Sequence, residues 1–185
     1  MFIQTEATPN PNTMKFLPGQ DVLGTGTAFF TDKDNAAKSP LAAALFEIKD
    51  VRAAFYGSDF ITVTKAEDAG WEVIKPPVLT TIMEHYVSGK PLIVEAGAAA
   101  TASRSYSADE QEIVDQIKEL LETRVRPAVA QDGGDIIFHA YEDGIVKLEM
   151  HGACSGCPSS TATLKQGIEN MLKHYVPEVI AVEPV

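Results

Sequence analysis

The chain contains two cysteines, Cys154 and Cys157, and both lie in one short segment, Gly152–Pro158 (GACSGCP). Thiolates are the soft nucleophiles and metal ligands among protein side chains. Pro158 suits the first position of a helix, where no backbone N–H is needed. The unpaired amides and the dipole of such a helix favour negative charge, so we expect both thiols to ionise more easily than a free cysteine.

Two thiolates at this spacing are compatible with three chemistries. They can exchange with disulfides as a dithiol, form half of a tetrahedral zinc site, or bind an iron–sulfur cluster. A structural zinc site or a 4Fe-4S cluster takes four protein ligands, whereas this chain supplies two sulfurs. His151 precedes Cys154 by three residues and can add a third zinc ligand, but we interpret it as an ordinary histidine that points to solvent.

If the cysteine pair binds iron, two chains must meet and each must give two thiolates to one cluster. A cluster held across such an interface is released when the dimer opens, which suits a carrier. The redox alternative is weakened because thioredoxin-like pairs follow a strand in a βαβ unit. Here the pair follows a hairpin pattern at residues 136–150, with Asp143-Gly144 as its turn. We therefore favour cluster or metal binding over a dithiol oxidoreductase.

The order of the secondary-structure patterns predicts an α+β protein of two small domains, each a small sheet packed with helices. Residues 1–90 alternate strand and helix patterns and carry no chemistry of their own. Residues 91–106 are rich in Ala, Gly and Ser and predict a linker. Residues 107–185 begin with a capping box at Ser107 and Glu110, followed by an amphipathic helix, the hairpin, the cysteine pair and a second amphipathic helix.

Two segments rich in Pro or Gly mark boundaries of helices. Pro76-Pro77 predicts the start of a helix that ends at Gly89. Asp132–Asp135 (DGGD) follows the first helix of the second domain. Its two carboxylates can act together, but glycines at a helix-to-strand reversal more often provide positive φ angles, so we interpret this segment as structural.

Composition excludes several classes of function. The net charge of −11 disfavours binding to nucleic acid or to anionic membranes. No apolar run is long enough to span a bilayer, and residues 1–10 do not resemble a secretion signal. Two closely spaced cysteines do not form a secreted disulfide framework, which favours a reducing compartment. We expect a soluble cytoplasmic protein.

Specific segments of both predicted domains resemble a known family. The second domain resembles the carboxy-terminal domain of NifU, the Nfu domain, in Asp132–Ile136 (DGGDI), Asp143–Val146 (DGIV), Gly152–Ser160 (GACSGCPSS) and Thr163–Lys165 (TLK). Residues 1–90 resemble the amino-terminal domain of bacterial and mitochondrial Nfu proteins in Thr8–Asn12 (TPNPN), Lys15–Gly19 (KFLPG), Ser39–Ala42 (SPLA), Asp59–Lys65 (DFITVTK) and Trp71. One departure is Asp50, where we expect a glycine before Val51.

The resemblance implies a non-enzymatic iron–sulfur cluster carrier. The family's cluster ligands fall on Cys154 and Cys157, and the implied cargo is a 4Fe-4S cluster bridging a homodimer, with 2Fe-2S as a second form. The implied partners are cluster-donating assembly proteins and apo iron–sulfur clients. A dithiol oxidoreductase and a zinc-binding interaction module stay open as alternatives. Since no transit sequence precedes Met1, we expect the bacterial cytoplasm rather than the mitochondrial matrix.

Overall fold

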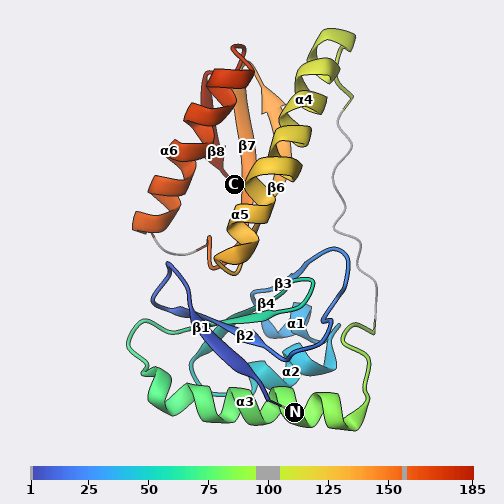
Figure 1. The fold of residues 1–185 in the computed structure, drawn as a ribbon, viewed down its shortest axis with the longest axis vertical. Helices are drawn as coiled ribbons and strands as arrows, with labels where there is room; N and C mark the ends of the chain where they lie inside the picture. The colour runs from blue at the N-terminus through green and yellow to red at the C-terminus, as the bar shows by residue number, and fades with distance from the viewer. Residues whose placement is uncertain (1, 95–104, 156–157) are drawn as a thin grey trace. The chain divides into compact units, whose positions relative to one another are not determined.

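The computed structural model describes residues 2–94, 105–155 and 158–185 (Figure 1). The chain divides into two compact units, Met1–Ala98 and Ala99–Val185. Each unit is a small sheet packed with helices, so the predicted α+β class with two domains is confirmed. The linker was predicted at 91–106, and most of that range lies outside the described residues.

The first unit is built on a five-stranded antiparallel sheet in the order β1-β2-β5-β4-β3. Its strands are β1 (Gln4–Ala7), β2 (Thr13–Leu17), β3 (Ala28–Phe30), β4 (Val51–Tyr56) and β5 (Ile61–Lys65). The helices are α1 (Lys33–Ala36), α2 (Pro40–Phe46) and α3 (Trp71–Ser88). One core joins these elements and includes the fully buried Phe16, Leu41 and Ile82.

Helix α3 begins at Trp71, so the predicted start at Pro76-Pro77 is wrong. The two prolines lie inside the helix, where each removes one backbone hydrogen bond. The turn before them is held by tertiary contacts instead. The Trp71 indole donates to the carbonyl of Pro11 at 3.0 Å, and Ile74 is 2% exposed. Burial of the first turn therefore outweighs the local preference of the prolines.

Asp50 precedes β4 with a φ of 71°, in the left-handed region that favours glycine. This is the position at which the sequence departs from the expected glycine. Asp tolerates left-handed backbone better than most residues do. The turn therefore keeps its conformation at some cost in free energy.

The second unit contains one long helical run and a three-stranded sheet. The run consists of α4 (Ala108–Leu120), the π-helical turn η1 (Leu121–Val125) and α5 (Arg126–Gln131). The capping box of Ser107 and Glu110 is present at its start. The remaining elements are β6 (Gly134–Glu142), β7 (Ile145–Gly152), α6 (Pro158–Tyr175) and β8 (Ala181–Pro184).

The sheet of the second unit has the order β6-β7-β8. The predicted hairpin is confirmed, since β6 and β7 are antiparallel and meet at Asp143-Gly144. The last strand, β8, lies parallel to β7. One core packs α4, α5 and α6 against this sheet. No helix in the described part of the chain is long and apolar enough to cross a membrane.

The π-helical turn has a cause in the sequence. Pro127 has no N–H, so it cannot donate to the carbonyl four residues earlier, and its ring crowds that carbonyl. The N–H of Arg126 donates to the carbonyl of Leu121, five residues earlier. The widened turn leads directly into α5, which ends at Gln131, shortly before the β6–β7 hairpin begins at Gly134.

Replacing Asp50 by glycine should stabilise the first unit. The substitution removes a left-handed non-glycine residue, so we expect the free energy of unfolding to rise by about 0.5–1 kcal/mol. Thermal unfolding of the full chain, followed by Trp71 fluorescence, measures this effect. The control is Lys49→Gly at the exposed neighbour, which lacks a positive φ and should lose stability. A loss of stability in Asp50→Gly would contradict the strain assigned to this turn.

Candidate functional site

Cys154 lies in the loop between β7 and α6 and is 6% exposed. Its backbone carbonyl accepts a hydrogen bond from Thr161 Oγ1 at 3.1 Å, which ties the loop to the first turns of α6. On the other side, Ser155 Oγ donates to the carbonyl of Gly152 at 2.9 Å. The loop is therefore held at both ends by hydroxyl groups. Cys157, the second predicted ligand, lies outside the described residues.

The turn between α5 and β6 packs directly against this loop. Gly133 has a φ of 81°, and its carbonyl accepts from the N–H of Ala153 at 3.1 Å. A Cβ placed on Gly134 would lie 2.5 Å from the Cys154 Sγ and 2.8 Å from the carbonyl oxygen of His151. The structural interpretation of these glycines agrees with the geometry, but sequence reasoning missed why the second is needed. Only a residue without a side chain lets β6 approach the thiol so closely.

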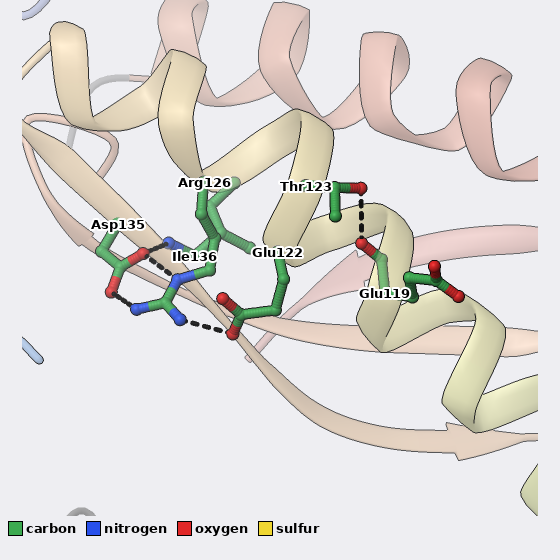
Figure 2. Close-up of polar contacts among 6 residues, drawn as sticks. All are labelled: Glu119, Glu122, Thr123, Arg126, Asp135 and Ile136. Carbon is green, nitrogen blue, oxygen red and sulfur yellow. Dashed lines mark hydrogen bonds and ion pairs between the residues drawn. The ribbon is translucent and has the colours of Figure 1, made fainter.

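Asp135 follows the two glycines and is almost completely buried, with 3% of its surface exposed. Arg126 binds it with two parallel hydrogen bonds, Nε to Oδ1 and Nη2 to Oδ2, each of 2.8 Å (Figure 2). The backbone N–H of Ile136 donates to Oδ1 at 2.9 Å, and Glu122 binds the guanidinium from the far side. These bonds raise the pKa of Arg126, with the bond to Asp135 as the largest cause. Sequence reasoning missed this pair because its nine-residue spacing follows no helical or strand period.

The thiol of Cys154 does not have the low pKa that the sequence predicted. Burial raises its pKa to about 12, and the negative charges of Asp132 and Asp135 add to the increase. The prediction of an easily ionised Cys154 is therefore wrong. It counted the helix dipole and overlooked the loss of hydration and the two nearby carboxylates. A buried, protonated thiol is a poor nucleophile, which weakens the dithiol oxidoreductase alternative.

His151 does not point to solvent, as the sequence suggested. It is 9% exposed, and its Nε2 lies 2.9 Å from Glu149 Oε1 on the same strand. Among the described residues, which leave out Cys157, no three His, Cys, Asp or Glu side chains gather in a way that can hold a metal ion. In the described part of the site, Cys154 is therefore a candidate ligand, and His151 is not placed to bind the same metal ion.

Two family models match the chain. One is described as "Scaffold protein Nfu/NifU N terminal" and matches residues 3–89. The other is described as "NifU-like domain" and matches residues 117–183, which include both cysteines. A solved structure of a NifU-like protein from Saccharomyces cerevisiae is 28% identical, covers 51% of this chain and 86% of its own, and has a TM-score of 0.47.

Full-length relatives are similar along the whole chain. "NifU-like protein 4, mitochondrial" of Arabidopsis thaliana is 53% identical over 99% of this chain and 65% of that protein. "NFU1 iron-sulfur cluster scaffold homolog, mitochondrial" of Drosophila virilis is 54% identical over 100% of this chain and 62% of that protein. The chain thus spans less than two thirds of the length of these relatives.

The names of these relatives contradict the expected bacterial cytoplasmic location and point to mitochondria. That expectation rested on the residues around Met1. This chain covers 65% of the Arabidopsis relative, so its first residue gives no information on where the protein is located.

Gly134→Ala should destabilise the second unit. Its new methyl group would clash with the Cys154 Sγ and with backbone, and overpacking of this kind costs about 1–3 kcal/mol. Hydrogen exchange of the β6 and β7 amides in the full chain measures the loss. Gly167→Ala in α6 is the matched control, because a Cβ there meets no atom within 4 Å and should stabilise the helix by about 0.5–1 kcal/mol. Unchanged exchange in Gly134→Ala would contradict the close approach.

The thiol of Cys154 should react slowly with iodoacetamide in the folded, metal-free chain. In a Cys157→Ser background we expect its rate at pH 8 to be at least about tenfold below that of glutathione, because the reactive thiolate forms only as the pH approaches the raised pKa. Mass spectrometry of the alkylated peptide gives the rate. The same chain in urea is the control and should react like a free thiol. A fast reaction with a midpoint near pH 8 in the folded chain would contradict the burial of Sγ.

Proposed function

The chain belongs to the NifU-like Nfu family, and on that premise we propose that it is a non-enzymatic iron–sulfur cluster scaffold and carrier. Its cargo is a 4Fe-4S cluster held across a homodimer by Cys154 and Cys157 of each chain, with 2Fe-2S as a second form. It receives clusters from assembly proteins and delivers them to apo iron–sulfur clients. Residues 107–185 form the cluster-binding domain, residues 1–90 a domain without metal ligands, and residues 91–106 the linker.

The observation that carries this proposal is the incomplete ligand set. The whole chain has two cysteines, and they lie in the segment matched by the NifU-like domain. Four thiolates are the usual ligands of a 4Fe-4S cluster, so one chain supplies half of a coordination sphere and a second copy supplies the rest. Relatives named iron-sulfur cluster scaffolds support the same role.

The buried state of Cys154 supports a cargo that is loaded and then released. Its Sγ lies against Gly134, so cluster binding requires the Cys154 side chain to move outward. Iron then replaces the thiol proton, because a coordinating sulfur is deprotonated outright. When the cluster leaves, the side chain returns to a site that the β6 turn already fits.

Anaerobic incubation of the full chain with ferrous iron and sulfide tests this function. We expect a dimer that holds about four iron and four sulfide ions per two chains, as native mass spectrometry and chemical analysis would show. Cys154→Ser and Cys157→Ser should each abolish the bound iron while leaving the circular dichroism spectrum unchanged. His151→Gln is the control and should keep the cluster, because its ring already binds Glu149.

The same preparation separates the alternatives. A zinc module would purify with stoichiometric zinc and ignore iron and sulfide, and a dithiol oxidoreductase would reduce a model disulfide catalytically without metal. Transfer of the loaded cluster to an apo 4Fe-4S enzyme should be faster than activation by free iron and sulfide. A loaded monomer, or a cluster retained by either serine variant, would refute the shared-ligand arrangement.

A further inference from the structure

Helix α3 carries apolar side chains on the face that does not contact the core. Val73 is 72% exposed, Met83 is 41% exposed and Val87 is 81% exposed. Pro76 and Thr80 are exposed between them. Large exposed apolar groups occur singly on most proteins, but an aligned row of them on one helix marks an interaction surface. We call these five residues the α3 seam.

The core of the first unit does not need the seam. Ile74, Val78, Ile82 and His85 form the inner face of α3, and the three aliphatic residues join the core of the first unit. Figure 1 shows α3 along one side of the five-stranded sheet, and no described helix or strand of this unit lies on the opposite face of α3. A surface helix normally presents charged or polar residues there. This helix is therefore apolar on two opposite faces.

The spacing of the seam is that of a helix–helix contact. Its members are separated by three, four, three and four residues, which are the a and d positions of a heptad. The polar group of Thr80 is satisfied within the helix, because its Oγ1 donates to the carbonyl of Pro76 at 3.1 Å. A facing helix can thus pack on the seam without burying an unsatisfied hydroxyl group.

We propose that the α3 seam binds the α3 seam of a second copy of this chain, with the two helices antiparallel. In the antiparallel a-to-d arrangement, Val87 lies opposite the partner's Pro76, and Met83 lies opposite the partner's Thr80. Glu72 at the start of the helix then comes within about one residue of the partner's Lys90, just beyond the end of the helix. The pairing of Glu72 with Lys90 occurs twice because the dimer is symmetric. The dipoles of the two α3 helices point in opposite directions.

The charges at the two ends favour this orientation. A parallel pair would set Glu72 against Glu72 and Lys90 against Lys90, whereas the antiparallel pair sets each against its opposite. Glu84, which borders the seam, falls near the partner's Pro77 and not near its own counterpart. The charged groups are therefore self-complementary, and the apolar contacts of the seam are those between positions 76 and 87 and between positions 80 and 83, while Val73 falls at the level of the partner's Lys90.

The contact should be weak by itself. The 18 residues of α3 extend over about 27 Å, so a single helix pair lies near the lower limit of area for a specific interface. A weak contact between the two α3 helices suits the proposed cluster-carrier function, and the purpose that we give to the contact rests on that function. Two chains that are held loosely through α3 bring their cysteine loops to a high effective concentration, so the second pair of thiolates arrives without a new encounter.

Sedimentation velocity of the full-length Cys154→Ser/Cys157→Ser chain tests the seam without any cluster or disulfide. We expect a reversible monomer–dimer equilibrium, and Met83→Glu and Val87→Glu should each raise the dissociation constant at least about tenfold. Val185→Glu is the control, because it adds the same charge at an exposed apolar residue, 58% exposed, that lies outside the seam. Trp71 fluorescence of each variant checks that the first unit stays folded.

The orientation has its own test on the same cysteine-free background. Chains with Pro76→Cys and chains with Val87→Cys, mixed under mild oxidation, should form disulfide-linked heterodimers in preference to either homodimer. Preferred homodimers would overturn the antiparallel arrangement. A chain that stays monomeric at high concentration, or glutamate variants that match Val185→Glu, would overturn the proposal and leave the seam to a helix of a different protein. None of these results depends on iron, so they stand apart from a failure of cluster assembly.

Discussion

The buried ion pair between Arg126 and Asp135 is the interaction on which the cysteine-bearing unit depends. The Asp135 carboxylate is bound by both guanidinium nitrogens that face it and by the N–H of Ile136, so its hydrogen-bonding capacity is largely used within the fold. Removing one partner of a buried pair costs about 3–5 kcal/mol, although the partly exposed Arg126 lowers that figure here. The pair fixes the start of α5 to the start of β6. The glycines between those two points are then held against the Cys154 loop.

The π-helical turn places Arg126, one partner of this ion pair. An uninterrupted α-helix from Ala108 to Gln131 would need an N–H at position 127, and the proline there does not provide one. The extra residue in the turn rotates the following segment relative to α4. Arg126 is the first residue after that rotation, and its side chain reaches β6 instead of continuing the face of α4. A single proline thus sets the direction of the side chain that anchors the site.

Local sequence patterns predict much of the fold, but they predict less of the geometry around Cys154. The hairpin at Asp143-Gly144, the capping box at Ser107 and the two-domain α+β class rest on short-range signals that tertiary contacts did not overturn. The start of α3 and the pKa of Cys154 depend on burial instead. The spacing of residues along the chain predicts neither the packing of Trp71 nor the nearby carboxylate of Asp135 that further raises the pKa of the thiol. For Cys154, sequence reasoning expected a lowered thiol pKa, whereas burial raises it.

The burial of Cys154 has a consequence for how readily its thiol is oxidised. A thiolate that solvent can reach attacks peroxide to give sulfenic acid and hydroxide, or attacks glutathione disulfide to give a mixed disulfide and a glutathione thiolate. Cys154 is 6% exposed and its thiol pKa is raised, so both reactions are slow at this residue. Burial of Cys154 in this conformation therefore slows the oxidation of that thiol.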